Sequence, residues 1–460
     1  MMKIDFSKPV HVYFIGIGGA NMSSLASIIL DKGFTVSGSD ERQSANTERL
    51  VVEGARVHIG QKVSHLNGTE DLVVYNAAIK EDNPDRVDAA KRGIPAVTRA
   101  EFLGKLMQNY GTPIGISGTH GKTSTTGMIS EIIMAAGLDP TLSLGGVLPS
   151  IGSTARDGGR EYFVFEACEY TNSFLSFFPK IAVILNIEED HLDFFKDIND
   201  IRNSFRRFAE LLPSDGTLVM NGEISNPGEI TGNLKGSLLT YGFDSAFDYY
   251  ADSVTYDNEG HPSFICHENA TGLAFPVTLS LTGRHNVSNS LAAIAAARKL
   301  GISHEVIADA LKNCSGSKRR FEKRGELNGA LIIDDFAHHP SEIKATLTAA
   351  RNLPHHDLWV VFQPHTYTRT KAFLHEFAEA LSMADHIILT DVYPAREEDI
   401  YGCNSVNLYE EIKKLGADIR YIKDFKEIEN CLKTNCTKND LLITMGAGNV
   451  VNIADSLTAK

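Results

Sequence analysis

The sequence is poor in cysteine, in long apolar runs and in positive charge. Its six cysteines are scattered without C-x-x-C pairs, which argues against a disulfide framework or a zinc finger and favours reduced thiols. No apolar run approaches the roughly 20 residues that span a bilayer. Lys and Arg number 44 against 58 Asp and Glu, a net charge of −14, and this balance disfavours broad binding to nucleic acid or to anionic lipid. Any anion must therefore be bound locally.

The first residues of the chain also bear on its location. Residues 1–9 run into an apolar strand pattern without the apolar core and small-residue cleavage site of a secretory signal. We therefore expect a cytoplasmic protein.

The length of the chain and the order of its patterns predict three domains. A chain of 460 residues exceeds the ~250 to 300 that one core usually supports. Short apolar strands alternate with helical patterns, which predicts an α/β fold with parallel sheets. Turn-prone residues at 109–111 and a basic stretch at 316–320 precede new strands. We expect an N-terminal Rossmann-like domain (1–110), a central P-loop ATPase-like α/β domain (111–317) and a C-terminal Rossmann-like α/β domain (318–460).

The same patterns predict individual elements. Strands are expected at 11–15, 35–38, 72–75, 112–116, 162–165, 181–185, 331–334, 358–362, 386–389 and 441–444, and helices at 22–30, 84–91, 99–108, 198–212 and 287–300. Open parallel sheets bind ligands beyond the carboxyl ends of their strands. Polar residues that follow these strands are therefore the candidates for a site.

The clearest motif is Gly118-Thr119-His120-Gly121-Lys122-Thr123, followed by Ser124, between a strand and a helix. Backbone N–H groups and the helix N-terminus of such a loop converge on phosphate oxygens. Lys122 would neutralise the β- and γ-phosphates, and the Thr123 hydroxyl would hold Mg²⁺. Ile116 stands where the general P-loop has its first glycine, and Gly118 is additional. We therefore predict ATP binding by a variant, more compact loop.

Two polar groups follow other central strands. Glu166 comes after the strand at 162–165, and Asp190-His191 come after the strand at 181–185. A carboxylate and a neutral imidazole there could bind a second divalent ion, or orient the water shell of the first. Either alone could be an ordinary polar loop start, but their shared position favours a site.

The N-terminal glycine loop is a weaker signal. Gly16-Ile17-Gly18-Gly19-Ala20-Asn21 precedes a helical pattern that opens at Met22, and Asp40 near the end of the second strand is a candidate ribose-binding acid. Asn21 stands at the third glycine position of the dinucleotide-binding pattern. The loop therefore predicts pyrophosphate binding rather than NAD binding, with a structural glycine turn as the alternative.

Two neighbouring strand ends of the third domain are rich in His, Arg and Asp. They are Asp334-Asp335-Phe336-Ala337-His338-His339-Pro340 and Gln363-Pro364-His365-Thr366-Tyr367-Thr368-Arg369. Asp335 or Thr368 could simply cap a helix. The two clusters together favour a polar pocket that faces the nucleotide.

In their order and spacing these motifs resemble the Mur ligases over essentially the whole chain. The resemblance rests also on Glu166-Ala167-Cys168-Glu169-Tyr170, Asn186-Ile187-Glu188-Glu189-Asp190-His191, Gly283-Arg284-His285-Asn286 and Arg319-Arg320-Phe321-Glu322. It implies an ATP-dependent ligase most similar to the alanine-adding branch. The first domain would hold the UDP-sugar and the second ATP, and the third would close over both with the amino acid.

The resemblance also implies a role for each matching residue. Gly118 to Ser124, Asn286, Asn289, Arg319 and Asp335 would bind ATP, and Lys122, Glu166, His191 and Arg320 would be catalytic. Thr123, Glu166 and His191 would hold Mg²⁺, or Mn²⁺ in its place. Gly16, Gly18, Gly19, Asn21, Met22 and Asp40 would bind the UDP-sugar, and Phe336, His338, His365 and Arg369 would line the amino-acid pocket.

The implied substrates are UDP-N-acetylmuramate, L-alanine and ATP. The lactyl carboxylate would attack the γ-phosphate, and the alanine amine would attack the resulting acyl phosphate in a step of peptidoglycan precursor synthesis. Two rival functions stay open. One is a recycling ligase that joins a preformed peptide to the same UDP-sugar, and the other is a nucleotide-binding oxidoreductase or sensor built on the Gly16 loop.

Three positions depart from the family pattern. Phe336 stands where this branch commonly has tyrosine, which removes a hydroxyl, and Thr366 stands where many relatives have arginine, which removes a cation. Residues 198–212 contain no lysine. We therefore expect no carbamylated lysine of the kind that bridges metals in several Mur ligases.

Overall fold

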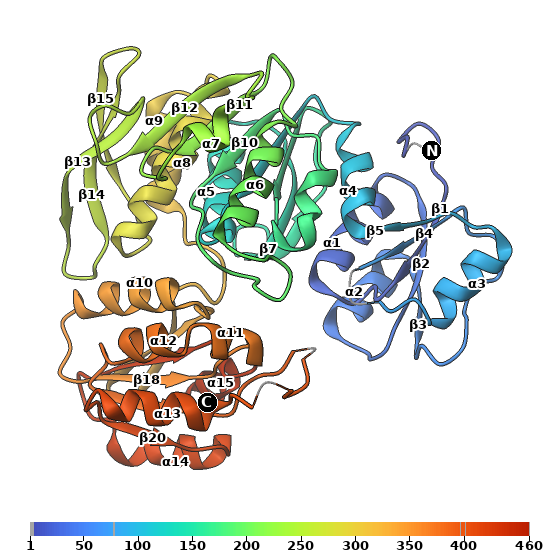
Figure 1. Cartoon of the computed structure of the whole chain (residues 1–460). Helices are drawn as coiled ribbons and strands as arrows, with labels where there is room; N and C mark the ends of the chain where they lie inside the picture. Colours follow the sequence, from blue (N-terminus) through green and yellow to red (C-terminus); the bar gives the residue numbers. More distant parts are fainter. Residues whose placement is uncertain (1–3, 77–78, 396, 401, 460) are drawn as a thin grey trace.

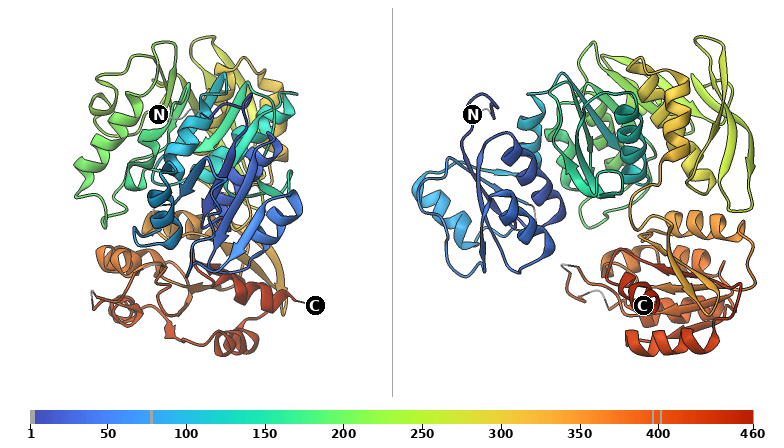
Figure 2. Two further views of the ribbon diagram at one scale, coloured as in Figure 1. Left: turned by 90° about the vertical axis from the view of Figure 1, so that its right-hand side faces the viewer. Right: turned by 180° about the vertical axis from the view of Figure 1, so that it is seen from behind.

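The computed structural model describes residues 4–76, 79–395, 397–400 and 402–459. Within these ranges the strands form three sheets that follow one another along the chain. Figure 1 shows the blue N-terminal part beside the central part and the orange C-terminal part below it. The view from behind in Figure 2 shows the same separation. The expected α/β organisation in three parts is confirmed.

The N-terminal sheet is parallel, with its described strands in the order β3-β2-β1-β4-β5. Apolar residues dominate its central strands because helices cover both faces. The last helix, α4, shares its apolar face with the central domain. The elements are β1 (His11–Ile15), α1 (Ala20–Asp31), β2 (Thr35–Asp40), α2 (Ala45–Glu53), β3 (Arg56–Ile59), β4 (Leu72–Tyr75), α3 (Pro84–Arg92), β5 (Ala96–Thr98) and α4 (Arg99–Met107).

The central sheet has the order β15-β14-β13-β12-β11-β10-β6-β9-β7-β8 among the described residues. It is parallel from β13 to β7, and the pairs β7–β8, β13–β14 and β14–β15 at its edges are antiparallel. Its elements are β6 (Thr112–Ser117), α5 (Lys122–Ala135), β7 (Thr141–Leu148), β8 (Ser153–Arg156), β9 (Tyr162–Glu166), η1 (Tyr170–Ser176), β10 (Ile181–Ile184), α6 (Ile198–Ala209), β11 (Thr217–Asn221), α7 (Gly228–Thr231), β12 (Ser237–Gly242), β13 (Tyr249–Tyr256), β14 (Pro262–Glu268), β15 (Leu273–Thr278), α8 (Arg284–Lys299) and α9 (His304–Asn313). Strand β6 therefore lies inside the sheet, between β10 and β9.

The C-terminal sheet has the order β16-β17-β21-β18-β19-β20 in the part of the chain that the structure describes. Strand β16 pairs antiparallel with β17, and the other pairs are parallel. The elements are β16 (Glu322–Leu327), β17 (Ala330–Asp335), α10 (Pro340–Arg351), β18 (Leu358–Phe362), α11 (Tyr367–Ala372), α12 (Leu374–Leu381), β19 (His386–Leu389), α13 (Ser405–Lys414), β20 (Ile419–Tyr421), α14 (Phe425–Asn435), β21 (Leu441–Met445) and α15 (Val451–Thr458).

Each strand and helix expected from the sequence is present. The strands at 11–15, 72–75, 358–362 and 386–389 have the expected ends, and the other elements have shifted ends. The helix expected at 198–212 ends at Ala209, and the one expected at 287–300 begins at Arg284, after Gly283 in a left-handed conformation (φ 91°). Strands β13, β14 and β15, which pair antiparallel with one another, were not predicted. No helix among the described residues is both long enough and apolar enough to cross a bilayer.

Candidate active site

The glycine loop between β6 and α5 is held tightly against its neighbours. Gly118 and Gly121 have φ values of 145° and 83°. A Cβ atom at Gly121 would lie 2.6 Å from Asn289 Oδ1, and one at Gly118 would lie 2.9 Å from Leu185 Cβ. The backbone N–H of His120 donates to Asn186 Oδ1 at 2.8 Å, and Asn186 Nδ2 donates to the His120 carbonyl at 3.1 Å. The loop conformation therefore needs glycine at two positions and is fixed by Asn186, which sequence reasoning missed.

Lys122 folds back onto this loop. Its Nζ donates to the Glu169 carboxylate at 3.0 Å, to the Thr119 carbonyl at 3.0 Å and to the Gly118 carbonyl. Burial opposes the charge of Lys122, but the buried Glu169 carboxylate outweighs it and raises the Lys122 pKa above its ordinary value. Lys122 is therefore a permanent cation at the phosphate loop. Its partner Glu169 was not predicted, although it follows Glu166 in one motif.

The three residues expected to hold a metal ion surround Lys122. Glu166 ends β9 opposite Ile116 and accepts the Gly145 N–H at 2.6 Å, and Thr123 lies in the first turn of α5. His191 stacks on Tyr170, with its Nε2 3.8 Å from Glu169 Oε1. Burial lowers the His191 pKa, so its imidazole is neutral. A hydroxyl, a carboxylate and a neutral imidazole suit a divalent cation. Among the described residues, neither Glu166 nor His191 belongs to a group of three close His, Cys, Asp or Glu ligand atoms.

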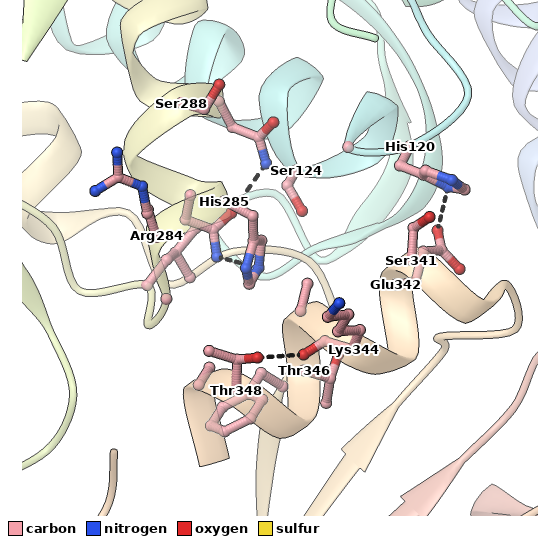
Figure 3. Close-up of a pocket in the computed structure, with 18 of the residues that line it drawn as sticks. His120, Ser124, Arg284, His285, Ser288, Ser341, Glu342, Lys344, Thr346 and Thr348 are labelled. Carbon is pink, nitrogen blue, oxygen red and sulfur yellow. Dashed lines mark hydrogen bonds and ion pairs between the residues drawn. The ribbon is translucent and has the colours of Figure 1, made fainter. Parts of the chain in front are cut away.

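A cavity of about 770 Å³ lies beside the loop, between the central and C-terminal domains. Figure 3 shows that α8 and α10 supply facing walls, with Ser124 and His120 at the loop end. Asn289 donates to Asn286 Oδ1 at 3.1 Å, and the Arg284 guanidinium lies 3.8 Å from the centre of the Phe243 ring. The cavity has the size and the mixed apolar and polar walls of a nucleotide site.

Asp335, Arg319 and Arg320 differ in the hydrogen bonds and ion pairs that their side chains form. Asp335 accepts N–H groups of Ala337 and Phe321 at 2.7 and 2.9 Å, and burial raises its pKa to about 6. Arg319 donates to Asp334 at 2.9 Å and to the carbonyls of Gly446 and Gly448. Arg320 lines the cavity, and its one ion pair within the described part of the chain is a long one, 3.9 Å, to Glu342. Arg320 is therefore the more available cation.

The residues expected at the amino-acid pocket lie together. The His338 ring packs edge-on against Phe336 and His365, with centroids 5.5 and 5.8 Å apart. Burial lowers the pKa of His338 to about 3 and that of His365 to about 4, so both are neutral. The guanidinium groups of Arg319 and Arg320 lie 5.0 and 5.1 Å from the centre of the Phe336 ring.

Arg369 is already paired with an acid of the central domain. Its guanidinium donates to Asp190 at 2.9 to 3.3 Å, and both side chains are only 8% exposed. Burial opposes ionisation of Asp190, but Arg369 outweighs it and holds the Asp190 pKa well below its usual range. This buried pair links the segment that follows β10 to helix α11.

A second contact joins the phosphate loop to the C-terminal domain. His120 lies 3.4 Å from a Glu188 oxygen and 3.3 Å from a Glu342 oxygen, and Ser341 donates to Glu188 at 2.5 Å. Figure 3 shows His120 pointing at Ser341 and Glu342. Both nitrogens of the adjacent His339 are engaged, with the Glu189 carbonyl and the Ser341 N–H. We call this set the His120 contact.

The His120 contact predicts that the stability of the protein depends on pH. Burial opposes the charge of His120, but Glu188 and Glu342 outweigh it and raise its pKa to about 9. A raised histidine pKa contributes stability that is complete below the unfolded value of about 6.5 and is lost as pH rises through about 9. Because Glu188 is 42% exposed, we expect solvent screening to limit the effect to about 1 to 2 kcal/mol.

The measurement is thermal unfolding of the wild type and of His120→Asn at pH 6.5 and 9.5. The wild type should lose its advantage over the variant at the higher pH. Equal differences at both pH values would contradict the assignment of His120 as a charged group.

The N-terminal glycine loop is braced by Asp40. Asp40 Oδ2 accepts the Gly18 N–H at 2.8 Å, and a Cβ atom on Gly18 would lie 2.9 Å from the same oxygen. Asn21 is exposed in the first turn of α1, whereas the Met22 side chain is 1% exposed in the core. A ligand at this loop would meet Gly16, Gly18, Gly19 and Asn21, but only the backbone of Met22.

Comparison with known proteins covers the whole chain. Family models match residues 11–111 ("Mur ligase family, catalytic domain"), 116–297 ("Mur ligase middle domain") and 319–448 ("Mur ligase, glutamate ligase domain"). The chain is 52% identical to the UDP-N-acetylmuramate--L-alanine ligase of Agathobacter rectalis over 460 residues, 100% of both chains. It is 50% identical to that of Lachnoclostridium phytofermentans over 470 aligned residues, also 100% of both.

Solved structures also match this chain over nearly its full length. The chain superposes on the UDP-N-acetylmuramate-alanine ligase MurC of Thermotoga maritima with a TM-score of 0.82 and 25% identity, covering 97% of this chain and 98% of that one. The murein peptide ligase of Psychrobacter arcticus matches with a TM-score of 0.74 and 26% identity, over 98% and 99% of the two chains.

Proposed function

This chain belongs to the Mur ligase family, and on that premise we propose that it joins L-alanine to the lactyl carboxylate of UDP-N-acetylmuramate with ATP. The observation that carries the proposal is 52% identity over the full length to a relative of that name. The reaction is an amide-bond-forming step of peptidoglycan precursor synthesis. The protein is therefore an ATP-dependent ligase of cell-wall biogenesis.

The chemistry explains the cations around the loop. A carboxylate is a poor acyl donor because its leaving group would be oxide. The lactyl carboxylate attacks the γ-phosphate and releases ADP, and the amine of alanine attacks the acyl phosphate, forms the amide and releases phosphate and a proton. Lys122 and Arg320 would neutralise the phosphoryl group during transfer, which is mainly catalysis by positioning and charge.

Thr123, Glu166 and His191 would hold Mg²⁺, or Mn²⁺, which neutralises the β- and γ-phosphates when bound. The fit rests on the donor types and on their positions around Lys122. The proposed ATP site also includes Gly118 to Ser124, Asn286, Asn289 and Asp335. Asn286 and Asn289 would meet the adenine, and Asp335 the ribose.

We assign residues 1–110 to the UDP-sugar, 111–317 to ATP and 318–460 to the amino acid. Gly16, Gly18, Gly19 and Asn21 would hold the pyrophosphate, with Asp40 bracing the loop through Gly18. Phe336, His338, His365 and Arg369 would line the alanine pocket. The neutral, closely packed rings of that pocket support a small amino acid rather than a peptide.

The test is phosphate release from ATP with UDP-N-acetylmuramate and a panel of alanine, glycine, serine and the tripeptide of the recycling ligase. We expect release only when UDP-sugar and amino acid are both present, fastest with alanine. Release without the UDP-sugar, or a preference for the tripeptide, would overturn the assignment. Binding of NADH would instead favour the oxidoreductase or sensor.

A further inference from the structure

Arg99 opens α4, the last helix of the N-terminal domain, and its side chain takes no part in capping that helix. The cap is made by its neighbours: the Thr98 hydroxyl accepts the Glu101 N–H at 3.2 Å, and the Glu101 carboxylate accepts the Thr98 N–H at 2.7 Å. Arg99 is partly buried. The helix therefore presents a long cation that its own structure does not use.

Helix α4 is fixed to the central domain. Its residues Phe102 and Leu103 share one hydrophobic core with Phe165 of β9 and Phe174 of η1. A Cβ atom on Gly104 would lie 1.9 Å from the Ser176 carbonyl oxygen, so the two backbones approach closely. Figure 1 shows α4 between the N-terminal sheet and the central domain. Arg99 thus has a fixed position relative to the central site.

That position is beside the segment that follows β9, because Ala100 of α4 and Ala167 belong to one hydrophobic core. Burial lowers the pKa of Arg99, and the groups that oppose this effect are Cys168 and Glu166. Burial raises the pKa of the Cys168 thiol to about 11, and the nearby cations Lys122 and Arg99 oppose this effect. Arg99 and Lys122 are therefore both near the short segment that follows β9, and the γ-phosphate would lie beside Lys122.

Arg99 differs from the other cations of the site. Lys122, Arg319 and Arg369 are paired with Glu169, Asp334 and Asp190, respectively. Across the described residues, the Arg99 guanidinium forms no hydrogen bond and no ion pair. A partly buried charge without a partner is costly. Its persistence at the reacting end of the site points to an anionic ligand.

We propose that Arg99 binds the lactyl carboxylate of the sugar nucleotide and holds it for attack on the γ-phosphate. A planar guanidinium binds a carboxylate through two parallel N–H···O bonds, which also orient it. The carboxylate is the group of the UDP-sugar that must lie beside the γ-phosphate, whereas the pyrophosphate would lie at the Gly16 loop. The inference rests on the proposed function, and it would make Arg99 a catalytic residue supplied by the N-terminal domain.

The test compares two sugar nucleotides that differ in the lactyl group. Binding of UDP-N-acetylmuramate and of UDP-N-acetylglucosamine, which lacks the carboxylate, is measured by calorimetry on the full chain without ATP. Wild type should prefer UDP-N-acetylmuramate. Arg99→Met should lower the affinity for UDP-N-acetylmuramate by about 10- to 100-fold and leave the affinity for UDP-N-acetylglucosamine unchanged. Arg99→Lys should have an intermediate affinity for UDP-N-acetylmuramate. In steady-state assays of Arg99→Met, the KM for UDP-N-acetylmuramate should rise and the KM for ATP should stay unchanged.

Stability separates ligand binding from a structural role. Because Arg99 has no partner, Arg99→Met should keep or raise the Tm of the ligand-free protein. Arg92→Ala is the matched control: Arg92 ends α3 and pairs with Asp88 on the surface at 3.0 Å, so both ligands should bind as to wild type. A lower Tm with equal loss of both ligands, or an Arg99→Met variant that still prefers UDP-N-acetylmuramate, would overturn the inference alone. Absence of the preference in wild type would overturn the proposed function.

Discussion

Replacing Lys122 by methionine is expected to lower kcat/KM about 10³-fold, the largest loss that any single change in this chain should cause. Lys122 is the cation fixed at the phosphate loop, and preorganised charge of this kind contributes strongly to phosphoryl transfer. The measurement is phosphate release at saturating UDP-N-acetylmuramate and alanine, with ATP varied.

A control is needed because Lys122 also neutralises Glu169. That carboxylate is 3% exposed, so Lys122→Met leaves a buried charge unpaired and should lower the Tm. The double variant Lys122→Met/Glu169→Gln should recover most of the Tm but none of the activity. If the double variant regained activity, the loss would come from misfolding and Lys122 would have no role in catalysis.

The second large effect is expected at the buried pair between Asp190 and Arg369. Arg369→Met leaves the Asp190 carboxylate buried without its partner, which typically costs about 3 to 5 kcal/mol. The Tm should fall accordingly, and the KM for alanine should rise because Arg369 would also line the amino-acid pocket. Thermal unfolding and initial rates with alanine varied measure the two consequences.

A double-mutant cycle shows whether the loss of stability comes from the unpaired Asp190 charge. Asp190→Asn/Arg369→Met removes both charges, so it should be more stable than Arg369→Met alone. The KM for alanine should stay high in the double variant, because the guanidinium is still missing. A double variant as unstable as the single one would show that Arg369 acts through packing rather than through its charge.

Local chemistry was readable from the sequence. The glycine loop from Gly118 to Thr123 could be interpreted because strand, turn and helix follow one another directly, and its function needs only backbone N–H groups and the next side chain. The positive φ values of Gly118 and Gly121 agree with that reading. The alternation of strands and helices predicted the parallel sheets for the same reason, since periodicity is a local property.

Contacts between segments that lie far apart in the sequence could not be predicted from it. Strands β13 to β15 form an antiparallel extension whose residue types do not follow burial: in β14, Glu268 is buried whereas Ile265 is only half-buried. Asp40 stands at a strand end, but the loop glycine that it binds, Gly18, lies 22 residues away in the sequence. Arg319 and Arg320 are adjacent in the sequence, yet Arg319 is bound to Asp334 while Arg320 faces the cavity.

The sequence by itself therefore determined the family, the three-part α/β organisation and the phosphate loop, because each depends on residues that are neighbours along the chain. Only the tertiary structure decided which charges are free to act. Glu169 pairs with Lys122, Asp190 pairs with Arg369, and Arg99 has no partner among the described residues. The physical reason is that the availability of a charge depends on burial and on partners from other segments, and these are set when the domains pack.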